Sequence, residues 1–382
     1  MTATFYEVTH PMLAKAAHDD LARELFNRSL TMFLEAEHRP RIRDVYERSV
    51  RPALSETLGH APTRREIAGA MRAHPANAWW YALRTRSQRT SYEIATKVVG
   101  DQMPDLMRRA ESLNGTCGGT LTLDPAVTVP NYIAGDIHLL EGGYHTERRT
   151  DDIAAGAIFD RQMTLNRMGA QGRLNDDPGN SLAAWVMDKF PQLKPKRILE
   201  IGCSVGHSLL PFKAAFPEAE VVGIDVAAPC LRYAHARAEG LGVPAHFVQQ
   251  NAEQTNFEDG SFDLVFSRIL LHETSRKALP RIFAECFRLL RKGGVMFHSD
   301  APQYDELDPY VASLRDWDIT CNNEPFMEVA YDLPLERMYA EAGFDAAACF
   351  RDRAPSQLVR ATGVDPKLMR SGGSMFLTGA TK

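Results

Sequence analysis

One stretch constrains the fold of this chain more than any other: residues 197–206, RILEIGCSVG, where an apolar β-type run breaks into a turn of small residues. The segment that follows, SLLPFKAAF, is apolar and helix-like. A strand that ends in such a turn before a helix can receive a nucleotide-sized ligand. Glycine lets the backbone approach the ligand, and the helix N-terminus presents free N–H groups. The sequence therefore predicts a parallel α/β sheet with a ligand site at the carboxyl end of this strand.

An acidic residue further along refines this prediction. The run AEVVGID ends in Asp225, which follows Gly206 by nineteen residues. At the tip of the next strand its carboxylate would accept hydrogen bonds from two ribose hydroxyls. The turn itself has a G-x-x-x-G spacing and matches neither the G-x-G-x-x-G pattern of pyrophosphate sites nor a P-loop. The combination indicates a nucleoside site.

Four motifs in order resemble the class I S-adenosylmethionine-dependent methyltransferases. The first is E-x-G-x-x-x-G from Glu200 to Gly206, followed by Asp225. Asn251-Ala252-Glu253 stands where that family usually places an acidic residue beside the adenine amino group, with Asn251 in place of the common Asp. The segments 262–273, FDLVFSRILLHE, and 289–300, LLRKGGVMFHSD, resemble the family's fourth and fifth strands. The resemblance covers about residues 165–382.

The resemblance implies an α/β fold, a doubly wound Rossmann-like seven-stranded sheet in the order 3-2-1-4-5-7-6 with an antiparallel seventh strand. It implies S-adenosyl-L-methionine as the cofactor. The residues that we expect to bind it are Tyr144, Glu200, Gly202, Cys203, Ser204, Gly206, Asp225, Val226, Asn251, Ala252 and Ser267.

The first third of the chain carries helical signals almost throughout. Between residues 11 and 113, apolar residues recur at spacings of three and four, which predicts about five helices, one of them from about Ala78 to Val99. Residues 114–129 are rich in Gly and Thr and indicate a loop with one short strand. We expect an all-helical N-terminal domain (1–129), a connecting lid segment (130–164) and a catalytic domain (165–382). The helices either pack on the catalytic domain or a second copy, or partly cover the site.

The connecting segment mixes chemically active side chains around a Gly-Gly hinge. A solvated linker would also be polar, but this mixture suits a segment that folds over a ligand. Many members of the resembled family cover the methionine part of the cofactor with a segment just before the first strand, and we assign Tyr144 and His145 to that role. The other polar residues of the segment include Asp136, His138, Glu141, Arg148 and Arg149.

Methyl transfer from a sulfonium needs mainly an acceptor held in line with the S–CH3 bond and shielded from water. Neither a metal nor a covalent intermediate is required, and a base is needed only for a hydroxyl or a protonated amine. His272 is the candidate base, although in the resembled family this position often only packs the strand-to-helix connection. The other candidate catalytic residues are Tyr144, His145 and Asp300.

A longer helical insertion, residues 303–342, contains the segment DWDITCNNEPFM, in which Asn-Asn-Glu-Pro breaks any helix. Its amides, acids and aromatic residues predict a loop that contacts the acceptor. The guanidinium and the acids would suit an amino-acid-like or carboxylate-bearing acceptor, and a thioether also fits the chemistry. The predicted substrate-binding residues are Arg268, Trp317, Asn322, Asn323, Glu324 and Phe326.

Composition indicates which binding partners and which cellular compartment to expect. A net charge of −5 over 382 residues gives no basic footprint for nucleic acid. The six cysteines form neither a C-x-x-C motif nor a Cys/His cluster at zinc spacing, so we expect reduced thiols, a cytoplasmic protein and no metal. The absence of a run of 18 apolar residues argues against a membrane span. By analogy with related enzymes, we expect a homodimer through the helical N-terminal domain.

The leading interpretation is a methyltransferase that acts on a small molecule by direct displacement. Two alternatives stay open, because this fold binds S-adenosylmethionine in the same way for different chemistry. One is an enzyme that cyclises or cleaves the cofactor itself and releases methylthioadenosine. The other is a non-catalytic protein that binds the cofactor for regulation or scaffolding.

Overall fold

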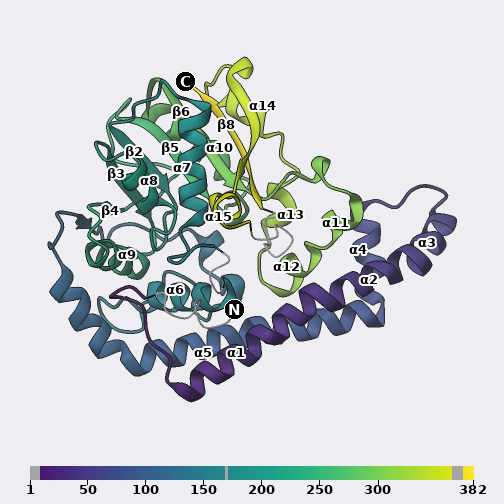
Figure 1. Ribbon diagram of the computed structural model, residues 1–382. Helices are drawn as coiled ribbons and strands as arrows, with labels where there is room; N and C mark the ends of the chain where they lie inside the picture. The colour runs from purple at the N-terminus through teal and green to yellow at the C-terminus, as the bar shows by residue number, and fades with distance from the viewer. Residues whose placement is uncertain (1–8, 168–170, 364–372) are drawn as a thin grey trace.

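An eight-stranded sheet forms the centre of the computed structural model, which describes residues 9–167, 171–363 and 373–382 (Figure 1). The strand order is β1-β4-β3-β2-β5-β6-β8-β7. β8 runs antiparallel to its two neighbours, β6 and β7, and the other described strand pairs are parallel. The strands are β1 (Thr120–Thr122), β2 (Arg197–Ile201), β3 (Glu220–Asp225), β4 (His246–Gln249), β5 (Phe262–Arg268), β6 (Leu290–Asp300), β7 (Cys349–Pro355) and β8 (Ser374–Thr381).

The seven predicted strands, β2 to β8, lie in the order 3-2-1-4-5-7-6, and the α/β fold class is confirmed. The expectation of seven strands was wrong by one. The Thr-rich segment after the helical region contributes β1, which pairs in parallel with β4, and Thr120 shares a hydrogen bond of 2.9 Å with His246. Its β-branched residues suit a strand, and pairing satisfies backbone groups that β4 would otherwise leave open at the sheet edge.

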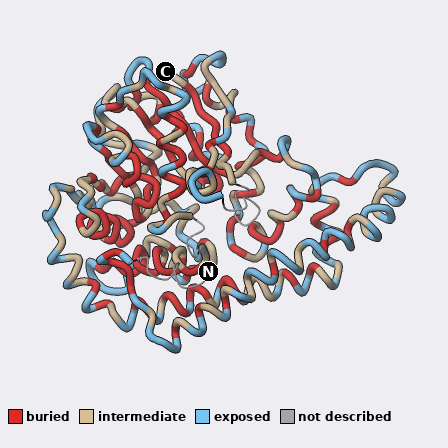
Figure 2. The backbone as a smooth tube through the Cα atoms, viewed as in Figure 1, coloured by how far each residue is buried: buried red, intermediate tan, exposed pale blue. Residues whose placement is uncertain are grey.

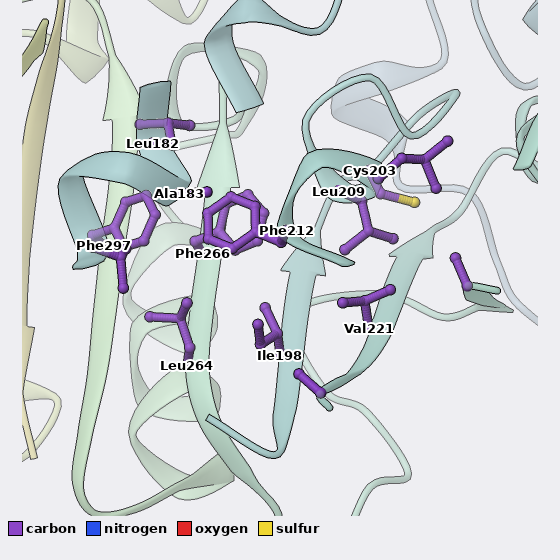
Figure 3. Close-up of a cluster of buried hydrophobic side chains, with 14 of the residues drawn as sticks. Leu182, Ala183, Ile198, Cys203, Leu209, Phe212, Val221, Leu264, Phe266 and Phe297 are labelled. Carbon is purple, nitrogen blue, oxygen red and sulfur yellow. The ribbon is translucent and has the colours of Figure 1, made fainter. Parts of the chain in front are cut away.

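Alternation along the strands builds two cores, one on each face of the sheet. Ile198, Leu264 and Phe266 point to the face covered by α7, α8 and α9. Figure 3 shows part of this core, in which Phe266 stacks on Phe212 with ring centroids 4.4 Å apart. The intervening residues, such as Leu199 and Val265, pack against α10 and α14. This period of two, buried on both faces, is what a parallel sheet between helical layers requires.

Within the described residues, five α-helices precede the sheet, as predicted. Two short π-helical segments join the first three of them, Leu34–His38 between α1 and α2 and Tyr46–Val50 between α2 and α3. The predicted helix from Ala78 to Val99 was too short, because Pro75 begins it at a position where proline fits and it continues past Pro104 to Leu113. These helices are α1 (His18–Phe33), α2 (Arg39–Val45), α3 (Arg51–Leu58), α4 (Arg64–Ala73) and α5 (Pro75–Leu113).

The remaining helices begin at the end of the lid segment, and most of them lie between the strands, with α11 to α14 following one another in the insertion between β6 and β7. They are α6 (Ala154–Arg167), α7 (Asp177–Lys189), α8 (Leu209–Ala215), α9 (Ala228–Gly240), α10 (Leu279–Leu289), α11 (Pro309–Ser313), α12 (Asp316–Cys321), α13 (Met327–Ala330), α14 (Leu335–Glu341) and α15 (Gln357–Thr362). Short 3-10 turns lie at Asn131–Ile133, Ile137–Leu139, Leu271–Glu273, Tyr304–Glu306 and Ala346–Ala348.

The 39-residue helix α5 connects two parts of the molecule. At about 1.5 Å per residue it is close to 60 Å long, and in Figure 1 it runs beside α1 along one edge. Its C-terminal half packs with α6 and α9 around Tyr92 and Val98. Its N-terminal half shares a core with α2, α4 and the insertion. Figure 2 shows that α1 and α5 alternate between buried and exposed positions, as amphipathic helices do. The domain boundaries at 129 and 164 stay a prediction.

The insertion docks on α5 through Trp317, which packs edge-on against Trp80 at 5.9 Å and donates a hydrogen bond of 3.1 Å to Thr85. Next to it, Asp316 accepts a hydrogen bond of 2.8 Å from Tyr81 and pairs with Arg72. Trp317 is only 2% exposed. The Trp317 indole attaches the insertion to α5. The structure therefore does not support the predicted contact between Trp317 and the substrate.

Two general properties complete the description of the fold. All six cysteines lie within the described residues, and each is a free thiol, as expected. Among the helices that the structure describes, none combines the length and the apolar character that a membrane crossing requires.

Replacing Trp317 tests how strongly the insertion is held. We expect Trp317→Ala to lower the free energy of unfolding by about 3–5 kcal/mol, since it removes a buried aromatic side chain from a packed contact. Trp79→Ala is the matched control, because Trp79 is 67% exposed on the same helix α5 and its loss should cost at most about 0.5 kcal/mol. Urea denaturation of both variants measures the difference, and equal effects would contradict the docking role.

Candidate functional site

The turn after β2 is held by the neighbouring strand. The backbone N–H groups of Gly202 and Cys203 both donate to the carbonyl of Ile224, at 2.8 and 3.0 Å. Gly202 has a φ of +69° and Ser204 a φ of +48°, in the left-handed region that glycine adopts without strain. A Cβ at Gly202 would also lie 2.7 Å from the Leu270 side chain. The predicted glycine turn therefore forms at the carboxyl edge of the sheet, against the segment that follows β5.

Asp225 ends β3 beside this turn. Its carboxylate accepts hydrogen bonds from the backbone N–H groups of Ser204 at 2.9 Å and Ala227 at 3.0 Å. Burial raises the pKa of Asp225, and these backbone donors partly offset that effect. Each oxygen keeps a second lone pair for a ligand hydroxyl. The geometry thus presents the carboxylate next to the glycine turn, as expected for a ribose contact.

Glu200 lies on β2 just before the turn and is 2% exposed. Its Oε2 has no hydrogen-bond partner among the described residues. Burial raises the pKa of this carboxyl well above its usual range, although the Arg268 guanidinium opposes the effect. A buried carboxylate oxygen without a donor is costly. A cationic ligand group reaching this oxygen would satisfy it.

Two of the predicted cofactor contacts do not face the site. The Cys203 thiol points into the core seen in Figure 3 and lies 2.7 Å from where a Cβ on Gly223 would stand. Ser267 is fully buried and shares a hydrogen bond of 2.7 Å with His298. Cys203 can therefore offer a ligand only its backbone. The Ser267 hydroxyl is taken up by His298 within the packed strands, so the predicted contact of Ser267 with the cofactor stays a prediction that its backbone would have to fulfil.

The loop after β4 is tied to the lid segment. Asn251 accepts a hydrogen bond of 3.0 Å from the backbone of Glu253 through its side-chain oxygen. Glu253 in turn accepts a hydrogen bond of 2.9 Å from Tyr132. Tyr132 meets Phe326 of the insertion edge-on at 6.1 Å. Asn251, Ala252 and Val226 are all half-buried, so this loop, the lid and the insertion lie together at one edge of the sheet.

Four ionisable side chains meet beyond the ends of β5 and β6: His138, His272, Glu273 and Glu324, called here the His2Glu2 cluster. The Nε2 atom of His138 lies 3.2 Å from Glu273 Oε1 and 3.3 Å from Glu324 Oε1. The Nε2 atom of His272 lies 3.5 Å from Glu273 Oε1 and 3.6 Å from Glu324 Oε2. Nitrogen and carboxylate oxygen atoms in this arrangement are able to hold a metal ion.

A second layer of polar groups surrounds the cluster. Asp300 accepts from His272 Nδ1 at 2.7 Å, and Tyr331 donates to the same carboxylate at 2.7 Å. Tyr144 lies 2.5 Å from His138 Nδ1 and 3.4 Å from the hydroxyl of Tyr92 on α5. The predicted residues Tyr144, His272 and Asp300 are thereby brought together, although they are far apart in the sequence.

The buried charges of this region set the protonation of its groups. Burial alone would lower the pKa of His272, but the carboxylates of Asp300 and Glu273 raise it well above its usual range. Burial also opposes the shift at His138, where Glu324 and Glu273 outweigh it and raise the pKa. The pKa of Asp300 is lowered, because the effect of His272 exceeds that of burial. In this arrangement His272 is a poor general base at neutral pH, since it holds its proton.

The other predicted residues differ in how they relate to the cluster. The Asn322 amide donates to Glu324 at 2.5 Å, and the Asn323 amide donates to the carbonyl of Asp136 in the lid at 3.0 Å. Both therefore position the loop. Arg268 lies at the end of β5, where burial lowers its pKa and the carboxylates of Glu200 and Asp300 oppose that change.

His145 stands outside the cluster. Burial lowers the pKa of its imidazole, and its Nδ1 has no hydrogen-bond partner in the part of the chain that the structure describes. The role predicted for it in catalysis stays a prediction.

Sequence reasoning placed Glu273 among the candidate groups on the acceptor side and His138 only among the polar residues of the lid, and it assigned no site role to Tyr331 or Tyr92. The sequence does carry a signal for two of these residues: His138 lies in the same polar segment as Tyr144, and Glu273 adjoins His272. It carries no such signal for Tyr92 and Tyr331, because a tyrosine within a helical pattern usually indicates a buried core position.

Comparison with known proteins places this site in context. A family model described as a methyltransferase domain matches residues 198–294, inside the region where the sequence motifs resemble such enzymes. A malonyl-[acyl-carrier protein] O-methyltransferase of Methylococcus capsulatus is 36% identical over 124 residues, covering 32% of this chain and 42% of that protein. A tRNA N(3)-methylcytidine methyltransferase of Drosophila melanogaster is 26% identical over 137 residues, with the same two shares.

Among solved structures, phosphoethanolamine N-methyltransferase 2 of Haemonchus contortus in complex with S-adenosyl-L-methionine is similar to this chain. It is 15% identical, with a TM-score of 0.37 over 53% of this chain and 52% of that one. The chain spans about half the length of the curated relatives it matches.

The buried pair of Ser267 and His298 predicts a pH effect on stability. Burial lowers the pKa of His298 to about 4, whereas histidine in an unfolded chain titrates near 6.5. Between these values the unfolded state binds the extra proton, so the free energy of unfolding falls as the pH drops. One such group contributes roughly 1.4 kcal/mol per pH unit, or about 3 kcal/mol over the window.

Urea denaturation between pH 4.5 and 6.5 measures this contribution in the wild type and in His298→Gln. We expect the variant to have the shallower dependence on pH. Circular dichroism at pH 7 verifies that the variant is folded. Parallel pH profiles for the two proteins would show that His298 takes up its proton in the folded state.

Proposed function

The chain belongs to the class I S-adenosylmethionine-dependent methyltransferases through its domain at residues 198–294, and from this premise we propose that it transfers a methyl group to a small-molecule acceptor. The observation that carries the proposal is the pair of neighbouring strand ends, where the Gly202–Gly206 turn lies against the carboxylate of Asp225. Parallel strand ends of this kind receive a nucleoside at the switch point of a doubly wound sheet.

The residues present fit S-adenosylmethionine. Asp225 would accept from the ribose hydroxyls, and Asn251 would face the adenine. The free Oε2 of Glu200 would accept from the ammonium group of the methionine part, which removes the cost of an unpartnered buried carboxylate oxygen. When bound, the cofactor supplies an activated methyl group on sulfur. The protein's part is to hold the acceptor in line and to exclude water.

The lid and the insertion are the acceptor side of this proposal. Tyr144 and His138 come from the lid, and Glu324 comes from the insertion. His138 contacts both Glu324 and Glu273, so the two segments meet at the turn that follows β5. Direct displacement by a neutral amine, thiolate or thioether needs no base. This agrees with His272, whose raised pKa keeps it protonated.

A small molecule is a better acceptor than nucleic acid for this site. Glu273, Glu324 and Asp300 are buried or half-buried acids at the acceptor side, and they would repel a phosphate backbone. The net charge of −5 points the same way.

We also propose that the protein is a cytoplasmic homodimer. The exposed Phe26 and Phe33 stand seven residues apart on α1 and so share one face of the helix. Sedimentation equilibrium tests the dimer, and a monomer at all concentrations would contradict it. The free cysteines agree with a reducing compartment.

Loss of Asp225 tests the cofactor site. We expect Asp225→Ala to weaken S-adenosylmethionine binding by about 1.5–3 kcal/mol, the scale of hydrogen bonds to a charged group, which is roughly 10- to 150-fold in affinity. Titration calorimetry measures the change. Asp188→Ala, on the exposed surface of α7, is the control and should bind as the wild type does. Unchanged affinity in Asp225→Ala would defeat the nucleoside assignment.

Product analysis tests the reaction. We expect the pure protein, S-adenosylmethionine and a pool of amines, thioethers, thiols, phenols and amino acids to yield S-adenosylhomocysteine only when one pool member is present. Mass spectrometry identifies the nucleoside product and the methylated acceptor. Methylthioadenosine formed without any acceptor would instead reveal attack on the aminobutyrate arm, and binding with neither product would indicate a non-catalytic protein.

A further inference from the structure

The four residues of the His2Glu2 cluster come from three separate segments and offer ligand atoms that all lie within 4.8 Å of one another. His138 comes from the lid, His272 and Glu273 from the turn after β5, and Glu324 from the loop between α12 and α13. We propose that they bind one divalent transition-metal ion. The sequence predicts no metal because only two of the four ligands are neighbours along the chain.

The distances within the cluster match those around a single ion. Zinc lies about 2.0–2.2 Å from imidazole nitrogen and carboxylate oxygen, so the edges of a tetrahedral site are about 3.4 Å long. The four nitrogen-to-oxygen distances of the cluster are 3.2, 3.3, 3.5 and 3.6 Å. These distances join five atoms, because Glu324 faces His138 with Oε1 and His272 with Oε2. An ion at the centre would reach one atom of each of the four residues with small movements of the side chains.

The same distances fit hydrogen-bonded ion pairs less well. A charge-assisted N–H···O bond is about 2.7–2.9 Å long, and all four contacts exceed this. The surroundings do form short bonds, such as His272 to Asp300 at 2.7 Å. The wider spacing is therefore confined to the atoms that converge on one point.

Both imidazoles are oriented as metal ligands usually are. A ligating histidine uses one ring nitrogen for the metal and holds the other in a hydrogen bond to a carboxylate or another oxygen. Asp300 holds Nδ1 of His272, and Tyr144 holds Nδ1 of His138. These contacts fix both rings with Nε2 toward the centre of the cluster.

The ligand set and the local charge select the kind of ion. Two imidazoles with two carboxylates suit Zn²⁺, Fe²⁺, Mn²⁺ or Co²⁺, whereas Mg²⁺ and Ca²⁺ prefer oxygen ligands alone. Neutral imidazoles would leave Glu273, Glu324 and Asp300 as three negative charges in a mostly buried site. A divalent cation compensates most of that charge, and on binding it displaces the protons that the carboxylates otherwise hold on the two histidines.

The position of the ion gives it access to the acceptor side. His272 and Glu324 side chains are 5% and 3% exposed, but those of His138 and Glu273 are 22% and 17% exposed. An acceptor or water could therefore approach from the side of His138 and Glu273. This relation to the acceptor rests on the proposed function, whereas metal binding itself does not.

Metal analysis of the full chain tests the inference. The purified protein is stripped with a chelator, equilibrated with Zn²⁺ in a chelator-buffered series and measured by plasma mass spectrometry. We expect one equivalent per chain, and affinity lower by about 100-fold or more in Glu324→Gln and in His138→Asn. Asn suits position 138 because its φ is +56°. Glu328→Gln, whose carboxylate pairs with Arg64 and Arg65, is the matched control and should bind like the wild type.

Substitution with Co²⁺ adds a geometric readout. Co²⁺ absorbs visible light much more strongly in a tetrahedral site than in an octahedral one, and we expect the intense spectrum in the wild type and in Glu328→Gln only. Circular dichroism verifies that each variant is folded. Less than stoichiometric Zn²⁺ in the wild type, or equal affinity in all variants, would overturn the proposal.

Calorimetry with S-adenosylmethionine on the same preparations separates the two proposals. Cofactor binding without stoichiometric metal binding would overturn only the metal site. Metal binding without cofactor binding would overturn only the proposed function.

Discussion

A short stretch of helix α5 determines how the candidate site is assembled. The Thr85 side chain accepts a hydrogen bond from Trp317 of the insertion, and Gln88 donates to the carbonyl of His138 in the lid. Residues three apart share one face of a helix, so the lid and the insertion are both attached to the same face of α5. This common attachment fixes their positions relative to each other. The 3.3 Å approach of His138 to Glu324 follows from their common attachment to α5.

The attachment also explains backbone strain near the cluster. His138 has a φ of +56° and Asn323, which precedes Glu324, has a φ of +57°. Left-handed backbone costs a non-glycine residue of order 1 kcal/mol or more and persists where the surroundings impose it. At His138 the carbonyl is held by Gln88, and at Asn323 the amide is held by the carbonyl of Asp136. Both strained residues lie next to groups whose direction matters for the cluster.

Sequence reasoning succeeded where signals are local. A strand, a glycine turn and an acid at the end of the next strand lie within 30 residues, and together they predicted that the turn and Asp225 lie side by side, as the Ser204–Asp225 hydrogen bond shows. The strand order was what the family resemblance implied. It failed for contacts that depend on packing. Nothing adjacent to Trp317 reveals that Trp80, more than 200 residues earlier, covers it. The same applies to the His2Glu2 cluster, because His138 and Glu324 become neighbours only after α5 has positioned their segments.

Charge links the acceptor to the metal. The expectation of a carboxylate-bearing acceptor rested on Arg268, whose guanidinium has the acids Glu200, Asp300 and Asp177 as electrostatic neighbours. These acids do not outweigh the effect of burial, because the pKa of Arg268 is lowered overall. Without a metal, the acids of the cluster favour a neutral or cationic acceptor such as an amine. With a divalent ion in place, an anionic group can approach from the side of His138, because the ion replaces the missing positive charge. The acceptor class therefore depends on what occupies the cluster.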